Sequence, residues 1–185
     1  RHSIEQHLRN QKEDGIRSLY KYSQIVVGTT VNEAMYATTG TDESFWNQWK
    51  EKFKSDLEKG QFITELNGLN NLPLENEQKE KLFSEPFHYL KRFFDAQEKE
   101  TKQFTKQDEL IYSICRKERL IELIYKFILY DNGEKKIARY PQYFGVKKTI
   151  ERIKTFDEKG RRLGGVNWKS QGSGKSLEMV MAAQQ

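Results

Sequence analysis

The feature that most constrains this chain is a glycine-rich tract near its C-terminal end. Residues 169–176 read Lys-Ser-Gln-Gly-Ser-Gly-Lys-Ser, and good helix formers follow from Leu177 onward. Glycines let backbone N–H groups turn toward a phosphate without a clashing Cβ atom. A helix that starts directly after such a loop adds its free N–H groups and its dipole to the same site. The tract therefore predicts a phosphate-binding P-loop, set between a short strand over residues 164–168 and a helix.

Each residue of the loop has an expected role. The backbone of Gly172, Ser173 and Gly174 would cradle a phosphate, and Lys175 would reach the β- and γ-phosphates of ATP. The Ser176 hydroxyl would ligate Mg²⁺, so ATP and Mg²⁺ are the expected cofactors. The general pattern asks for glycine where this chain has Lys169. The alternative is a chance Gly-Ser-Gly-Lys-Ser tract in a flexible linker, against which the expected strand and helix argue.

A second candidate lies upstream, in the sequence Arg139-Tyr140-Pro141-Gln142. A glutamine side chain has an acceptor oxygen and two donor hydrogens, so it can pair with N7 and the N6 amino group of adenine. Taken alone, Arg139 and Gln142 would be ordinary surface residues. With a P-loop downstream, we interpret them as ATP-binding residues.

Composition sets broad limits. The chain has 185 residues, a net charge of +5, 36% hydrophobic residues and one cysteine. The cysteine count excludes an internal disulfide and suits a reducing cytoplasm, which is the expected location. No apolar run approaches the ~20 residues of a membrane span, so no membrane partner is expected. The slight excess of basic residues is compatible with a nucleic-acid partner and equally with an ordinary solvated surface.

Periodicity and turn signals predict mixed helices and strands. The expected elements are a helix over 3–14, a hairpin from 19–30 and 32–37, a helix with an aromatic face over 43–58, a connector over 59–76, helical segments over 77–100, 106–114 and 117–129, a turn at 131–133, and a helix over 143–156 after Pro141. In the alternative for 117–129, the helix passes into a strand at residues 127–130.

Four blocks of sequence resemble one family, in that family's order. They are similar to the restriction (R, motor and endonuclease) subunit of type I restriction-modification enzymes. The blocks are residues 34–41 with 45–50, 116–123, 135–144 and 164–176.

This resemblance implies a fold class and a division of the chain. The fold would be an α+β and α/β fragment in which residues 1–58 form the tail of a PD-(D/E)xK-type nuclease domain, built from a hairpin plus helices. Residues 59–104 would be a helical connector, and residues 105–185 the beginning of a RecA-like superfamily 2 motor. The parent enzyme would translocate double-stranded DNA at the expense of ATP and cleave it. Its partners would be double-stranded DNA and the modification (M) and specificity (S) subunits.

The chain departs from the family in two ways. Gln6 matches the glutamine of a Gln-x-x-x-Tyr motif that supports the nuclease, but Asn10 stands where the tyrosine is expected. The nuclease carboxylates are not recognisable in residues 1–60, and we expect them upstream of this segment. The motor's Asp-Glu box is not in the chain either, so we expect an internal piece that neither hydrolyses ATP nor cuts DNA. The alternatives are another P-loop helicase or NTPase, and a non-enzymatic DNA-binding or structural module with a glycine-rich tail.

Overall fold

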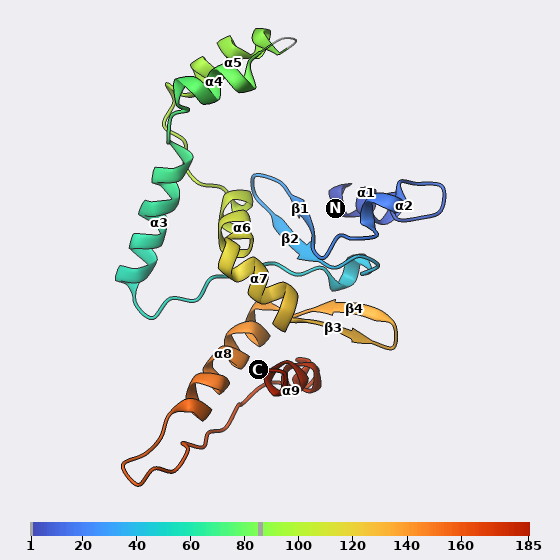
Figure 1. The fold of residues 1–185 in the computed structure, drawn as a ribbon, viewed down its shortest axis with the longest axis vertical. Helices are drawn as coiled ribbons and strands as arrows, with labels where there is room; N and C mark the ends of the chain where they lie inside the picture. The colour runs from blue at the N-terminus through green and yellow to red at the C-terminus, as the bar shows by residue number, and fades with distance from the viewer. Residues whose placement is uncertain (1, 85–86) are drawn as a thin grey trace.

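The computed structural model describes residues 2–84 and 87–185, which form helices and two small antiparallel hairpins (Figure 1). This mixture confirms the α+β character of the predicted fold. The elements are α1 (His2–Asn10), α2 (Arg17–Tyr20), β1 (Val26–Thr29), β2 (Ala34–Ala37), the 3₁₀ turn η1 (Glu43–Phe45), α3 (Asp56–Asn70), α4 (Asn76–Leu82), the 3₁₀ turn η2 (His88–Leu90), α5 (Lys91–Gln97), α6 (Lys106–Cys115), α7 (Lys117–Lys126), β3 (Ile128–Asp131), β4 (Glu134–Ile137), α8 (Tyr140–Lys154) and α9 (Lys175–Ala183).

Both hairpins are antiparallel. The first is the hairpin that the sequence predicted, with Val26 of β1 opposite Ala37 of β2. Its first strand is shorter than expected because residues 17–20 form α2. In the second, β3 and β4 are joined by Asn132 and Gly133, whose φ angles of 51° and 84° lie in the left-handed region. Two such residues in a row match the twist of a tight hairpin, which confirms the predicted turn.

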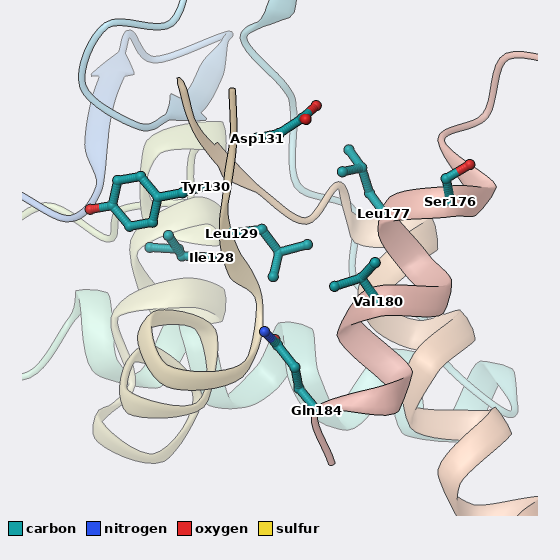
Figure 2. Close-up of a pocket in the computed structure, with 8 residues that line it drawn as sticks. All are labelled: Ile128, Leu129, Tyr130, Asp131, Ser176, Leu177, Val180 and Gln184. Carbon is teal, nitrogen blue, oxygen red and sulfur yellow. The ribbon is translucent and has the colours of Figure 1, made fainter. Parts of the chain in front are cut away.

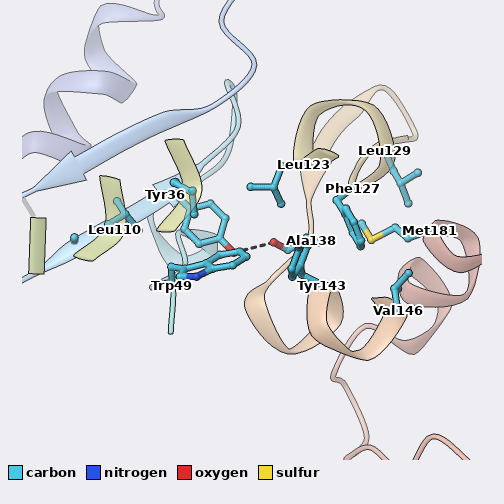
Figure 3. Packing of buried hydrophobic residues seen from close by; sticks show 12 residues of the cluster. Tyr36, Trp49, Leu110, Leu123, Phe127, Leu129, Ala138, Tyr143, Val146 and Met181 are labelled. Atoms are coloured by element: carbon cyan, nitrogen blue, oxygen red, sulfur yellow. Dashed lines mark hydrogen bonds between the residues drawn. The ribbon is translucent and has the colours of Figure 1, made fainter. Parts of the chain in front are cut away.

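One hydrophobic cluster, called the central core here, connects the first hairpin to the C-terminal helices (Figure 3). The Tyr36 hydroxyl of β2 donates a hydrogen bond of 2.8 Å to the Ala138 carbonyl, just before α8. The core thereby fixes α8 and α9 relative to β2. Its buried members are Ala34, Tyr36, Trp49, Leu110, Ile114, Leu123, Phe127, Leu129, Ala138, Tyr143, Val146 and Met181.

The predicted aromatic helix over residues 43–58 is wrong. Before α3 begins at Asp56, only η1 is helical in this range, and the chain between them forms no helix. The Asn47 N–H donates to the Tyr36 carbonyl at 3.0 Å, and the Asn47 carbonyl accepts from the Tyr36 N–H at 2.8 Å. These bonds to β2 occupy the backbone groups that a helix would need. Trp46 and Trp49 consequently enter two different hydrophobic clusters instead of lining one helix face.

The expectation that residues 59–76 form a long loop is largely wrong as well, because α3 occupies most of this range. The Ser55 hydroxyl caps α3 by accepting from the Glu58 N–H at 3.2 Å. Gly60 and Gly68 lie within this helix, and a Cβ atom at either position would meet open space. Together α3, α4 and α5 form an arm that extends away from the central core (Figure 1). The helical prediction for 77–100 corresponds to α4, η2 and α5, and residues 85–86 lie outside the described part.

The predicted strand over residues 164–168 is also wrong. This segment has no regular secondary structure and pairs with none of the described strands, and Val166 and Trp168 are 90% and 92% exposed. A strand needs a neighbour for its backbone groups, and here the Gly164 carbonyl instead accepts from the Arg152 side chain at 3.1 Å.

The helices predicted over 106–114, 117–129 and 143–156 are present as α6, α7 and α8, each within a few residues of its expected ends. The chain passes from α7 into β3, which confirms the alternative of a strand near residues 127–130. Pro141 lies in the first turn of α8, where its missing N–H has no helical partner to lose. Within the described residues, no helix combines the length and apolar character needed to cross a bilayer.

Candidate phosphate-binding loop

Two glycines set the backbone path of the loop between residue 170 and α9. Gly172 and Gly174 have φ angles of 75° and 76°, in the left-handed region that residues with a Cβ atom rarely adopt. Gly174 directly precedes α9, and no side chain caps that helix end. The first N–H groups of α9 therefore lack intrahelical partners and point out of the helix start, as an anion site requires.

Lys175 begins α9 and folds back across the loop. Its Nζ atom donates to the carbonyl oxygens of Lys169 at 3.1 Å and Ser170 at 3.2 Å. Beside it, the Ser173 hydroxyl oxygen is buried and has no hydrogen-bond partner among the described residues. The loop thus combines an exposed cation, a polar atom with unused bonding capacity and a helix N-terminus.

Ser176 is exposed and lines a pocket of about 450 Å³ between β3 and α9 (Figure 2). Asp131 of β3 lines the same pocket, and its carboxylate is ion-paired with Lys136 at 2.6 Å. No group of three or more His, Cys, Asp or Glu side chains suited to a metal occurs in residues 2–84 and 87–185. Mg²⁺ commonly relies on one or two protein groups together with substrate phosphates, and the exposed Ser176 hydroxyl fits that pattern.

The structure brings Gln142 to the loop. Gln142 is 4% exposed in the first turn of α8, and its Nε2 group donates to the carbonyls of Ser173 at 3.3 Å and Gly174 at 3.1 Å. Its Oε1 atom accepts from the Arg139 N–H at 2.9 Å. The amide therefore supports the loop from behind, and these bonds use the same groups that pairing with adenine would use. Arg139 is exposed at the start of α8.

Gln6 lies apart from this site. It is exposed on α1, which packs against β1 and η1 (Figure 1). Its neighbour His7 is held by the Tyr20 hydroxyl at 2.9 Å and the Val27 carbonyl at 3.0 Å. The structure thus assembles Gln142 and the loop residues in one place and keeps Gln6 in another.

Sequence reasoning missed a buried ion pair directly behind the loop. Lys169, noted only as a departure from the glycine pattern, pairs with Glu178 of α9. No motif signals this contact, because Lys169 lies before the loop and Glu178 lies in α9. The two side chains meet only because α9 packs on α8. The one available signal was Gly145 in the middle of a helical stretch, since a glycine there suggests a close approach.

Next to the loop, α7 and α8 share a second polar network. The Glu122 carboxylate accepts from the Tyr143 hydroxyl and from Lys147 Nζ, both at 2.6 Å. Burial raises the pKa of Glu122, but the hydrogen bonds from Lys147 and Tyr143 more than offset it, so the net pKa lies below its ordinary value. Burial likewise raises the pKa of Tyr143, which stays protonated as a donor. Because Tyr143 follows Gln142, this network orients the turn that supports the loop.

Comparison with known proteins gives two results. The family model described as SWI2/SNF2 ATPase matches residues 141–185, which include Gln142, the loop and α9. The chain is also similar to curated endonuclease subunits of type I restriction enzymes, which confirms the resemblance found in the sequence. No solved structure matches the chain.

Three of these relatives show the extent of the similarity. The putative MjaVIIIP endonuclease subunit of Methanocaldococcus jannaschii is 31% identical over 115 residues, 59% of this chain and 10% of the relative. The HindI endonuclease subunit of Haemophilus influenzae is 39% identical over 80 residues, 40% of this chain and 8% of the relative. The putative MjaIXP endonuclease subunit of Methanocaldococcus jannaschii is 39% identical over 85 residues, 43% of this chain and 8% of the relative. The chain spans a tenth or less of the length of these relatives.

Proposed function

We propose that the loop from Ser170 to Ser176 binds the phosphates of ATP, and that the chain is part of the ATP-driven motor of a type I restriction endonuclease subunit. The observation that carries this proposal is the pair of left-handed glycines, Gly172 and Gly174, at the uncapped start of α9. The match to the SWI2/SNF2 ATPase family over the same residues supports it.

In this proposal each loop residue has a defined task. The N–H groups of residues 172–176 bind phosphate oxygens, and Lys175 leaves its two loop carbonyls to bind the β- and γ-phosphates. Ser176 ligates the Mg²⁺ ion that neutralises the phosphates when ATP is bound. Gln142 and Arg139 bind the adenine side, which requires the Gln142 amide to exchange bonds with the carbonyls of Ser173 and Gly174 for bonds to the base.

The remaining assignments rest on the similarity to restriction subunits. Residues 1–58 would be the C-terminal part of a nuclease domain, with Gln6 supporting cleavage, and residues 59–104 a helical connector. Residues 105–185 would begin the first RecA-like motor domain. The whole enzyme would move along double-stranded DNA and cut it together with modification and specificity subunits. Under this division, the packing of β2 and Trp49 onto α6 and α8 in the central core would be a direct contact between the nuclease and motor parts.

Substitution of the loop lysine tests nucleotide binding. The 185-residue chain should bind MgATP in isothermal titration calorimetry, and Lys175→Ala should weaken binding by about a hundredfold or more, since a charge-assisted contact to phosphate contributes several kcal/mol. Lys59→Ala, in exposed sequence on the α3 arm, removes the same charge and should leave affinity unchanged. Equal affinity of the Lys175→Ala chain and the unmodified chain would contradict ATP binding by this loop. It would favour a glycine-rich tail with no role in nucleotide binding.

A further inference from the structure

A buried ion pair holds the segment that enters the loop. Lys169 Nζ bonds the Glu178 carboxylate and also donates to the Pro141 carbonyl at 3.0 Å. The two side chains are 14% and 5% exposed. The second carboxylate oxygen of Glu178 accepts from Asn167 Nδ2 at 2.8 Å. The residues before the loop are therefore tied at two points to α9 and at one to α8.

Gly145 of α8 creates the space for this pair. A Cβ atom at position 145 would lie 2.2 Å from Glu178 Oε1 and 2.9 Å from Lys169 Nζ. Any side chain there would push the pair apart, because 2.2 Å is far inside contact distance. The close packing of α9 on α8 thus requires glycine at position 145, because the Lys169–Glu178 ion pair occupies the space beside it.

The negative charge of Glu178 is close enough to the proposed phosphate site to affect phosphate binding. Glu178 lies in the first turn of α9, at the helix end that the loop presents. An uncompensated carboxylate in a partly buried site near that end would repel phosphate. Lys169 neutralises it, and two of the three donors of the ammonium group are already used on Glu178 and Pro141.

Residues 169 and 170 also hold the side chain of Lys175 in place. Lys175 Nζ bonds the carbonyl of Lys169 itself and that of Ser170. A shift of residues 167–170 would therefore move the groups that hold Lys175 in reach of the phosphate site.

We propose that Lys169 is a positioning residue of the nucleotide site and not a phosphate ligand. Its ion pair with Glu178 fixes residues 167–170 against α8 and α9 and cancels a negative charge beside the phosphates, so that Lys175 is the loop's phosphate-binding cation. The consequence for affinity rests on the proposed ATP-binding function, whereas the effect on the loop's rigidity does not.

A double-substitution cycle separates the two roles of Lys169. Lys169→Met should weaken MgATP binding by about tenfold, because it leaves the Glu178 carboxylate buried and unpaired. Glu178→Gln alone should change affinity by no more than about threefold, since Lys169 keeps a hydrogen-bonding partner. The double variant should regain most of the affinity lost by Lys169→Met. A double variant as weak as Lys169→Met would mean that Lys169 binds phosphate directly, and it would overturn the proposal.

Amide hydrogen exchange without nucleotide gives an independent readout. Lys169→Met should speed exchange at residues 170–174 by about tenfold, and adding Glu178→Gln should reverse most of that change. Lys81→Met, which breaks an exposed ion pair with Glu77 on α4, is the matched control and should leave the loop unchanged. Unaltered exchange in the Lys169→Met chain would overturn the proposal. Absence of MgATP binding by the unmodified chain would contradict the proposed function alone.

Discussion

At the scale of single residues, the conformation of the loop requires glycine at two positions, for different reasons. Gly172 and Gly174 share nearly the same left-handed φ, but their surroundings differ. No atom lies within 4 Å of a Cβ built on Gly172, whereas a Cβ on Gly174 would lie 2.4 Å from Gln142 Nε2. Backbone conformation alone requires glycine at the first position, and conformation together with the Gln142 contact requires it at the second.

This difference predicts unequal effects of alanine. Gly172→Ala should lower the free energy of unfolding by about 1 kcal/mol, the cost of a left-handed residue with a Cβ atom. Gly174→Ala should lower it by about 2–3 kcal/mol, because the new methyl group also displaces Gln142 from its two carbonyls. Urea denaturation of both variants measures the difference, and equal losses would show that the Gln142 contact contributes nothing to the loop.

Residue roles could be predicted only where a motif carries them. The spacing of glycine, lysine and serine was enough to predict the P-loop and the helix that follows it. The same sequence could not reveal that Gln142 bonds the loop backbone, because an amide can pair equally with adenine or with a carbonyl. The pairing of Lys169 with Glu178 depends on how α9 packs against α8, and no local pattern encodes that packing.

At the scale of elements, α7 and α8 are joined by a titratable contact. The pKa of Glu122 lies below its ordinary value of 4.5 because its bonds from Lys147 and Tyr143 outweigh burial. A carboxyl with a lowered pKa in the folded state stabilises the fold above its unfolded pKa, and this stabilisation is lost as pH falls through the folded pKa.

The contact therefore predicts acid sensitivity. As pH falls from about 7 to about 3, the unmodified chain should lose more unfolding free energy than the Glu122→Gln variant, which has no carboxyl to protonate at this position. Glu118→Gln, an exposed change on the same helix, should follow the unmodified chain. Thermal unfolding monitored by circular dichroism over this pH range measures the effect, and parallel curves for Glu122→Gln and the unmodified chain would contradict it.

Helices were predicted correctly where the spacing of apolar residues alone determines them. The predictions failed where hydrogen bonds to residues distant in sequence determine the backbone conformation. Apolar residues at spacings of three and four predicted α6, α7 and α8 from the sequence. The aromatic residues at 45–53 have the same spacing, yet the bonds between Asn47 and Tyr36 keep that segment extended. Within residues 164–168 only Val166 and Trp168 favour a strand, whereas the two glycines and the asparagine disfavour it. A strand also needs a neighbour, which local sequence cannot supply.

At the scale of the whole molecule, the central core links the first hairpin to α8 across more than half of the chain. The hydrogen bond from the Tyr36 hydroxyl to the Ala138 carbonyl is fully buried. Tyr36→Phe should lower the free energy of unfolding by about 1–2 kcal/mol, because it leaves that carbonyl unsatisfied. Tyr130→Phe, at a residue that is 71% exposed, should change it by less than about 0.5 kcal/mol. Chemical denaturation tests both, and matching stabilities would show that this link is not a significant part of the core.

The whole chain should bind nucleotide without turning it over. Phosphoryl transfer needs metal-binding and water-orienting groups placed together around the phosphates. Glu178 of α9 is committed to Lys169, and Asp131, which lines the pocket with Ser176, is committed to Lys136. A coupled phosphate-release assay with double-stranded DNA should therefore detect no ATP hydrolysis by the 185-residue chain. Hydrolysis that disappears in Lys175→Ala would contradict this expectation.

The central claim is that residues 172–176 form the anion site, and amide chemical shifts test it most directly. In a ¹⁵N-labelled chain titrated with MgATP, the largest saturable shifts should fall on Gly172 to Ser176 and on the side-chain amide of Gln142. The α3 arm should show none. Shifts centred away from the start of α9, or no saturable shifts, would contradict the claim.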